Sequence, residues 1–342
     1  MTRTLLTGGS GFIAAHVLNV LLKRGHSVVT TVRSQEKAEQ IKAAYPGVST
    51  KSLDFVIVPE VSADGAFDKA VVSDPPFEAV IHTASPFRLN VQDVKRDILD
   101  PAINGTTGLL KAIKNHAPTV KRVVVTSSGA AILDFSKPIS HTFTAADWNL
   151  LTWEEATSNP LNAYRASKVF AEKAAWDFVE DEKPQFSLTA LNPTMVYGPI
   201  IHHLDDLAGL NASNERIRDI AFGATKTTGL PYTGVFLWVD VRDLADAHVL
   251  AIEKPEAAGR RFLVSPGHYT NREIAEVIRE EFPELRDGLP TGEEALKGGD
   301  YPTANGWYGY DSSPAEDVLG VRFRGFRECI VDTVKSLQPL VK

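Results

Sequence analysis

Cysteine is nearly absent from this sequence: Cys329 is the single one among 342 residues. An intramolecular disulfide is therefore impossible, which suits a reducing compartment, and we expect the protein to be cytoplasmic. Long hydrophobic runs are also lacking. No apolar segment approaches the roughly 20 residues that span a bilayer, so the sequence predicts no membrane partner. Residues 1–6 lead directly into a strand pattern, and we expect no signal peptide.

An excess of basic residues is lacking too. The chain carries 36 Lys and Arg against 43 Asp and Glu, a formal net charge of −7. Proteins that bind nucleic acid neutralise its phosphates with lysine and arginine, so this balance argues against a nucleic-acid partner. His202 and His203 are adjacent, but no cysteine or carboxylate stands at metal-ligand spacing beside them, and we expect no metal site.

The pattern that is present alternates short apolar runs with amphipathic stretches. Strands are expected at residues 3–7, 27–32, 55–58, 79–83, 122–126 and 187–191. Helices are expected between them at residues 12–23, 34–45, 101–115 and 163–179. Strands that alternate with helices of this length run parallel and are joined by right-handed crossovers, so the pattern predicts a doubly wound sheet.

A glycine-rich turn separates the first expected strand from the first expected helix. Gly8, Gly11 and Ala14 follow the spacing G-x-x-G-x-x-A, with Gly9 as an additional glycine. Glycine permits a tight turn and lets backbone N–H groups reach a pyrophosphate, while the helix N-terminus adds its partial positive charge. The motif predicts a dinucleotide site formed by Gly8, Gly9, Ser10, Gly11, Phe12 and Ile13.

The fold class expected from these patterns is α/β, a Rossmann-type doubly wound parallel sheet with a smaller C-terminal substrate lobe. After Pro199 the alternation stops, and residues 235–241 and 261–264 are expected to be strands that return to the sheet. We therefore predict two domains. The Rossmann domain comprises residues 1–199 plus 236–265, and the substrate-binding lobe comprises residues 200–235 plus 266–342.

The end of the second strand indicates which dinucleotide binds. An NAD-binding protein usually has Asp or Glu there, where it holds the ribose 2′-hydroxyl. This chain has no acid at the strand end, and Arg33 and Lys37 follow it on one face of the next helix. Two cations at this place suit the 2′-phosphate of NADPH, although Glu36 lies between them.

Tyr164 and Lys168 stand four residues apart on an expected helix and so share one face. A free phenol titrates near pH ~10, and a neighbouring ammonium favours the phenolate and lowers that pKa. Such a phenol can give a proton to a carbonyl oxygen while hydride arrives. The fifth strand leads into residues 126–128, where a hydroxyl can stabilise charge on the same oxygen. We predict that Tyr164, Lys168 and a serine of this segment are catalytic.

Further stretches complete a recognisable series: residues 8–14, 33–39, 82–87, 126–128, 162–168, 170–176, 192–193, 196–199 and 240–243. In this order they resemble the extended short-chain dehydrogenase/reductase superfamily. Within it, the chain is similar to the fungal NADPH-dependent carbonyl reductases that act on methylglyoxal and 3-methylbutanal, and more distantly to plant dihydroflavonol reductases. The resemblance covers nearly the whole chain.

The resemblance implies further roles. Ser128, rather than Ser127, matches the catalytic serine of the family. Tyr164 is the proton donor, and Lys168 lowers its pKa and holds the nicotinamide ribose, so both also contact the cofactor. The resemblance places Glu60 and Val61 near the adenine, and Val196 and Ser213 at further cofactor contacts. Its proton relay would include Asn104.

The resemblance also implies the substrate side of the site. Phe87, Leu133 and Tyr197 occupy positions that line the pocket of relatives. Gly129 stands where a fungal relative has a bulky aromatic residue, and this difference is expected to open space beside the substrate.

These features favour NADPH-dependent reduction of a small aldehyde or ketone by a monomer or homodimer. Two alternatives stay open. A nucleotide-sugar epimerase or dehydratase has the same fold and triad but usually retains NAD. An NADP-sensing regulator also has this fold, but such proteins tend to lack the Tyr–Lys pair, which is intact here.

Overall fold

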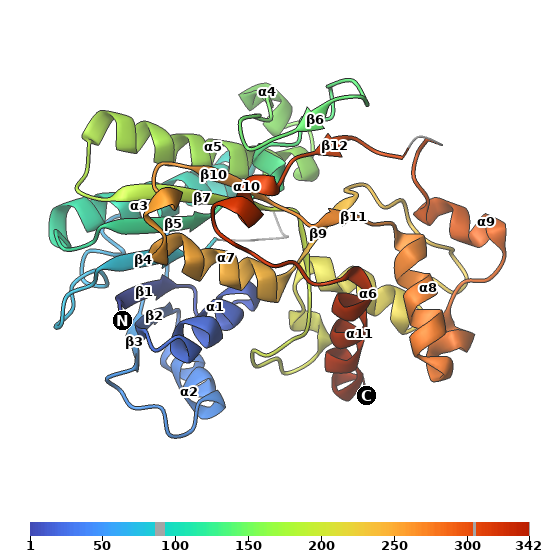
Figure 1. Ribbon diagram of the computed structural model, residues 1–342, viewed down its shortest axis with the longest axis horizontal. Helices are drawn as coiled ribbons and strands as arrows, with labels where there is room; N and C mark the ends of the chain where they lie inside the picture. The colour runs from blue at the N-terminus through green and yellow to red at the C-terminus, as the bar shows by residue number, and fades with distance from the viewer. Residues whose placement is uncertain (86–92, 304–305, 342) are drawn as a thin grey trace.

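The computed structural model describes residues 1–85, 93–303 and 306–341. Within these residues seven strands form one fully parallel sheet, which confirms the predicted doubly wound α/β fold (Figure 1). The strand order is β10 (Arg261–Val264), β7 (Ser187–Pro193), β5 (Arg122–Thr126), β4 (Ala79–His82), β1 (Arg3–Thr7), β2 (Ser27–Val32) and β3 (Leu53–Ile57). The order reverses between β1 and β4, and ligands of such sheets bind at the carboxyl ends of the strands at this point.

Helices cover both faces of the sheet. In Figure 1, α3 (Asp100–His116) and α5 (Pro160–Glu182) lie above it, and α1 (Phe12–Lys23), α2 (Gln35–Ala44) and α7 (Val241–Glu253) lie below it. Successive strand residues point to opposite faces, so Leu6 joins the hydrophobic cluster of α1 and α7 while Leu5 joins the cluster of α3. Burial on both faces explains why the strands are continuous apolar runs.

Helix α5 is longer than the sequence pattern predicted. The expected range was 163–179, whereas the helix runs over Pro160–Glu182. Its N-terminus is set by Asn159, whose side chain accepts the backbone N–H of Asn162 at 2.9 Å, and proline follows at the first helical position. The helix ends at Lys183, which has a φ of 42°.

A second, three-stranded sheet corrects one prediction. Residues 235–241 were expected to return to the main sheet, but β9 (Leu237–Asp240) pairs instead with β8 (Met195–Tyr197) and β11 (Gly267–His268). The reason is that β10 already occupies the edge of the main sheet beside β7. The prediction for residues 261–264 is therefore confirmed, whereas the one for residues 235–241 is wrong.

The smaller lobe lies on the right of Figure 1. Its helices α6 (Ala212–Ala221), α8 (Asn271–Glu281) and α11 (Phe326–Leu337) bury one hydrophobic core. That core includes Ile217, Ile220, Tyr269, Ile274, Ile278, Ile330 and Val334. The shorter elements are α4 (Trp153–Ala156), α9 (Glu293–Leu296), α10 (Ser313–Asp317), β6 (Thr142–Phe143) and β12 (Gly309–Tyr310).

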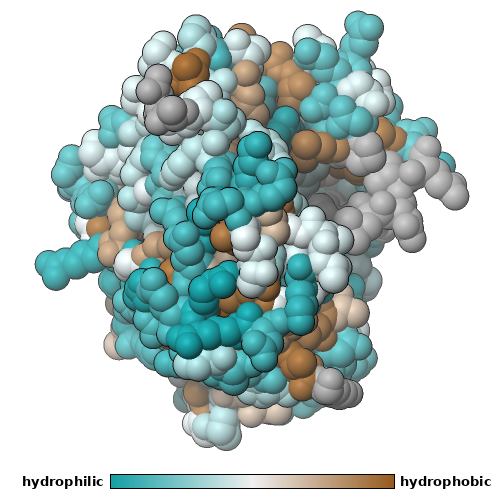
Figure 2. Space-filling view, turned by 90° about the vertical axis from the view of Figure 1, so that its right-hand side faces the viewer, coloured by the Kyte–Doolittle hydropathy of each residue, from teal (hydrophilic) through white to brown (hydrophobic). Residues whose placement is uncertain are grey.

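The surface that the lobe presents is mostly hydrophilic, with separate small hydrophobic patches (Figure 2). Among the described residues, no helix is both long enough and apolar enough to cross a bilayer.

Candidate active site

The glycine-rich turn lies where the strand order of the main sheet reverses. Gly8 has a φ of 77°, a left-handed conformation that glycine adopts without strain. A Cβ at this position would lie 3.0 Å from the Cα of Ala84, which follows β4. A Cβ on Gly9 would overlap the hydroxyl of Thr30 on β2. The close approach of these segments therefore requires both glycines.

The N-terminus of α1 meets this turn and suits a phosphate group. Gly11 at the N-cap has no side chain to cap the helix, and the first turn, residues 12–15, is apolar. Its first N–H groups and the helix dipole can therefore serve an anion. Gly9 and Ser10 also line a hollow together with Lys37 and His202. The residues of the turn, Phe12 and Ile13 included, fit the pyrophosphate of a dinucleotide.

Arg33 and Lys37 stand at the start of α2, as the sequence predicted. Arg33 is exposed and Lys37 is half-buried. The hydroxyl of Ser34 accepts the backbone N–H of Lys37 at 3.4 Å, and the Lys37 ammonium donates to Gln40 at 2.8 Å. The carboxylate of Glu36 accepts a hydrogen bond from the same Gln40 side chain at 3.3 Å. The fold thus brings Lys37 to the hollow beside the glycine turn.

Ser128, Tyr164 and Lys168 are brought together from two elements. Ser128 follows β5, and the other two project from α5. The Ser128 hydroxyl forms a hydrogen bond with the Tyr164 phenol, and the Lys168 ammonium lies 5.9 Å from the centre of the Tyr164 ring. All three are half-buried, so they remain accessible.

The electrostatics of this group differ from the sequence-based expectation. Burial raises the pKa of the Tyr164 phenol, and the hydrogen bond to Ser128 offsets part of that rise. Burial also lowers the pKa of Lys168 from 10.5 to about 8. The net shift of the Tyr164 pKa is therefore upward, whereas the ammonium of Lys168 was expected to lower this pKa.

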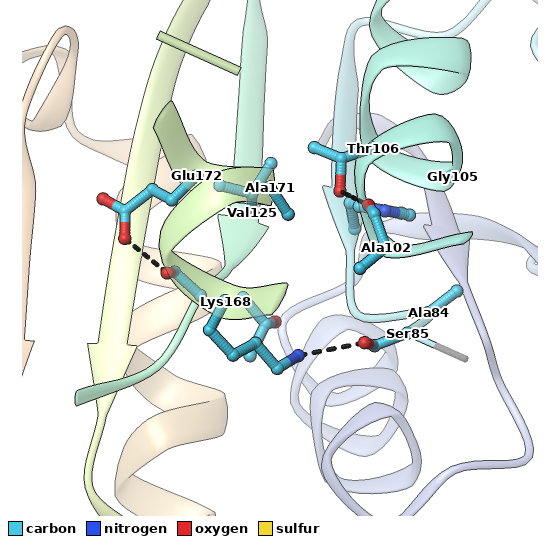
Figure 3. A pocket seen from close by; sticks show the side chains of 12 residues that line it. Ala84, Ser85, Ala102, Gly105, Thr106, Val125, Lys168, Ala171 and Glu172 are labelled. Atoms are coloured by element: carbon cyan, nitrogen blue, oxygen red, sulfur yellow. Dashed lines mark hydrogen bonds between the residues drawn. The ribbon is translucent and has the colours of Figure 1, made fainter. Parts of the chain in front are cut away.

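Ser85 is a contact that the residue pattern did not single out. The Lys168 ammonium donates to the Ser85 hydroxyl at 2.9 Å, across the gap between α5 and the segment after β4 (Figure 3). Both residues line a small cavity of about 30 Å³, together with Thr106 on α3. Asn104, expected in a proton relay, is instead exposed on α3 and does not line this cavity.

The remaining predicted cofactor residues lie farther along the site. Glu60 and Val61 follow β3. The Glu60 carboxylate accepts a hydrogen bond from the Ser62 hydroxyl at 2.7 Å. Val61 is half-buried against Gly105 of α3. Two further residues occupy the region that joins the sheet to the lobe. Val196 is buried on β8, and Ser213 is half-buried in the first turn of α6, which packs against β8.

Of the predicted substrate residues, Leu133 and Tyr197 are packed into the described interior. Phe87 lies outside the described residues. Leu133 is buried in a cluster with Phe143 and Tyr308. Tyr197 is fully buried, and its hydroxyl donates to that of Tyr269 at 2.8 Å.

The absence of a side chain at Gly129 does not open space. A Cβ there would lie 3.2 Å from the Thr194 side chain and 3.3 Å from the carbonyl oxygen of Pro193. The glycine instead lets residues 129–131 pack tightly against the end of β7, so the expectation of added room beside the substrate is wrong.

The sequence was then compared with known families. Residues 4–265 match the NAD dependent epimerase/dehydratase family. The chain belongs to this family. A ketoreductase of Aspergillus niger, azaE, is 46% identical over 98% of this chain and 97% of its own length. The NADPH-dependent methylglyoxal reductase Gre2 of Saccharomyces cerevisiae is 38% identical, with 97% of each chain covered.

A solved member of this family has nearly the same fold. The crystal structure of Gre2 from Candida albicans in complex with NADPH superposes with a TM-score of 0.92, at 35% identity and with 100% of both chains covered. These similarities confirm the predicted resemblance to the extended short-chain dehydrogenases and to their fungal carbonyl reductases.

Two residues of the site, Ser85 and His202, were not predicted from the sequence. Ser85 falls in the stretch 82–87 that carried the resemblance, and its position after the strand beside the switch point is the signal that could have identified it. His202 joins the hollow beside Lys37, and burial lowers its pKa to about 4. In the described part of the chain, no group of three histidine, cysteine or acidic residues is arranged to hold a metal ion.

Proposed function

We propose that this protein is an NADPH-dependent carbonyl reductase that converts a small aldehyde or ketone to an alcohol. The proposal rests on one observation: the side chains of Ser128, Tyr164 and Lys168 lie close together beside the glycine turn. Relatives named as a ketoreductase and as a methylglyoxal reductase, similar over nearly their full length, support the same reaction.

When bound, NADPH supplies the hydride. Tyr164 donates the phenolic proton to the carbonyl oxygen of the substrate. A phenol is protonated at neutral pH, which is the form that a proton donor needs. Ser128 can hydrogen-bond the same oxygen and stabilise its developing charge. The Lys168 ammonium stabilises the phenolate that remains after proton transfer.

The proposed binding roles are those that the motifs and the family resemblance imply. Gly8, Gly9, Ser10, Gly11, Phe12 and Ile13 would hold the pyrophosphate, and Arg33 and Lys37 would hold the 2′-phosphate. Glu60 and Val61 would lie near the adenine. Val196 would face the nicotinamide, Lys168 would hold the nicotinamide ribose, and Ser213 would make a further cofactor contact. Phe87, Leu133 and Tyr197 would shape the substrate side, the last two from within the packed interior.

We further propose that residues 1–199 and 236–265 bind the cofactor while residues 200–235 and 266–342 bind the substrate. The protein acts in the cytoplasm as a monomer or homodimer, and its partners are NADPH and the small carbonyl compound.

The direct test is NADPH oxidation by the purified protein over aliphatic, aromatic and dicarbonyl substrates, with chiral analysis of the alcohols. We expect stoichiometric alcohol formation with at least one of these classes. No oxidation across the panel, together with tightly held NAD released on denaturation, would favour an epimerase or dehydratase instead. No oxidation together with a captured protein partner would favour a regulator.

A further inference from the structure

A buried carboxylate lies directly behind the catalytic residues. The Glu172 side chain on α5 is 1% exposed. Its Oε2 accepts hydrogen bonds from the Ser127 hydroxyl and from the Asn192 amide, the latter at 2.7 Å. Its Oε1 accepts from Nε of Arg261 at 2.6 Å and from the Trp176 indole at 3.3 Å. One carboxylate therefore bonds to β7, β10, its own helix and the end of β5.

The carboxylate shares a face of α5 with the reacting groups. Tyr164, Lys168 and Glu172 are four residues apart in succession, so they stand on adjacent turns of one helix face. Figure 3 shows Glu172 one turn from Lys168 on this helix. Any rotation or shift of α5 that displaced Glu172 would displace the phenol and the ammonium as well.

The same network holds the strand end that carries Ser128. Ser127, its neighbour, donates to Glu172 directly. The Asn192 amide, which bonds Glu172, also donates to the carbonyl oxygen of Ser128 at 3.1 Å. The two halves of the catalytic group, on α5 and after β5, are thus tied to each other through Glu172.

Arg261 is itself anchored, so it gives the carboxylate a fixed partner. Its Nη1 donates to the carbonyl oxygens of Ala145 and Asp147, both at 2.7 Å. The guanidinium lies 3.7 Å from the centre of the Trp148 ring. A charge pair held on several sides resists displacement, because any movement would break several charge-assisted hydrogen bonds at once.

We propose that Glu172 is a positioning residue for carbonyl reduction: it fixes α5 against the end of β5 so that the Tyr164 phenol and the Ser128 hydroxyl meet the same oxygen. The proposal rests on the function proposed above. It predicts that loss of the carboxylate slows the chemical step while the cofactor, held mainly by the glycine turn and α2, still binds.

The test compares Glu172→Gln with the wild-type enzyme. Glutamine keeps the size of the side chain but presents an N–H group to hydrogen-bond donors. We expect kcat to fall about 10- to 100-fold, because a small misplacement of the reacting groups lowers the rate by about this factor. The dissociation constant for NADPH, measured by fluorescence, should stay within about twofold. Glu172→Asp should lose less kcat than Glu172→Gln because it keeps the charge.

The matched control is Asp243→Asn. Asp243 is another buried acid paired with an arginine, Arg324, and it joins α7 to the segment before α11. None of its hydrogen bonds within the described residues reaches Ser128, Tyr164 or Lys168. This variant should lose thermal stability and keep kcat within about twofold. An equal loss of kcat in both variants would show a general structural effect and overturn the proposal.

A milder variant covers the case in which Glu172→Gln does not fold. Ser127→Ala removes one hydrogen bond to the carboxylate and leaves the charge pair intact. This variant should lower kcat about threefold or more. Its unfolding temperature should fall by no more than the loss of one hydrogen bond explains. An unchanged kcat in Ser127→Ala, or in folded Glu172→Gln, would overturn the proposal.

A spectroscopic measurement separates this proposal from the proposed function. With ¹³C-labelled tyrosine, the Tyr164 resonance is assigned by its loss in Tyr164→Phe. We expect it to shift in Glu172→Gln and to stay in place in Asp243→Asn. If the wild-type protein reduced no carbonyl compound, the proposed function would fail, while this shift would still decide whether Glu172 positions the phenol.

Discussion

The two regions of the molecule use buried polar groups differently. Behind the strand ends of the main sheet, Glu172 and Arg261 form a buried charge pair. Its hydrogen bonds connect it to the segment of the half-buried Ser128. In the hydrophobic core of the lobe, which the β8 residue Tyr197 joins, the Tyr197 hydroxyl donates to Tyr269, which also accepts from Arg216 at 3.3 Å. Both tyrosines are fully buried within the core that packs α6, α8 and α11.

The difference lies in what each network supports. Around Glu172, hydrogen bonds hold groups that must meet a ligand, so changes there should appear in rates. In the lobe, hydrogen bonds satisfy polar atoms inside a packed core, so changes there should appear in stability. The following variants test this contrast.

The largest effect is expected from Tyr164→Phe. Removing the phenolic hydroxyl removes the proton donor, and kcat should fall about 10²- to 10⁴-fold while NADPH still binds. Steady-state kinetics and fluorescence titration measure the two quantities. Tyr310→Phe is the control, since its hydroxyl donates to the Pro266 carbonyl and not to a predicted catalytic residue. Turnover of Tyr164→Phe at the wild-type rate would rule out the mechanism.

Acid should destabilise the sheet region through its buried histidines. The Nδ1–H of His248 donates to the Leu244 carbonyl at 2.7 Å, and Nε2 accepts from the Thr126 hydroxyl at 2.6 Å. Burial lowers the pKa of His248 from 6.5 to about 4, and that of His82 likewise. The neutral ring is thus favoured in the folded state, so its contribution is full above pH 6.5 and is lost as pH falls toward 4.

At about pH 4 this loss amounts to about 3 kcal/mol for each histidine. Urea unfolding between neutral pH and pH 4.5 measures it. His248→Gln should flatten the dependence of the unfolding free energy on pH. Parallel curves for the variant and the wild type would contradict the assignment.

Arg33→Ala tests the cofactor side of the contrast. Loss of the guanidinium should weaken NADPH binding roughly tenfold, about 1.4 kcal/mol, and change NADH binding little, because NADH has no 2′-phosphate. Lys42→Ala, in the last turn of the same helix, is the control for surface charge. Equal weakening of NADPH and NADH binding would remove the argument for a preference for NADPH.

The smallest effect is expected from Tyr197→Phe in the lobe. Removing the hydroxyl that donates to Tyr269 should cost about 1 kcal/mol of stability and leave the KM for the carbonyl substrate within about twofold. Thermal unfolding and kinetics measure both. A large rise in KM with unchanged stability would instead show that the Tyr197 hydroxyl itself contacts the substrate, and it would remove the contrast between the regions.

Much of the cofactor side could be predicted because it depends on local constraints. Gly8 needs its left-handed φ whatever surrounds it, and helix spacing alone places Tyr164 and Lys168 on one face. The substrate side could not be predicted in this way. Whether Tyr197 faces a pocket or a core, and whether Gly129 leaves a gap, depends on segments distant in sequence.

The sequence by itself determined the alternation of strands and helices, the phosphate-binding turn and the spacing of the reacting residues, since each depends on neighbours within a few positions. Only the tertiary structure decided that β9 leaves the main sheet, that Ser85 meets Lys168, and that Glu172 joins α5 to the end of β5. Those outcomes follow from the packing of remote elements and from the need to satisfy buried polar groups, which local patterns do not encode.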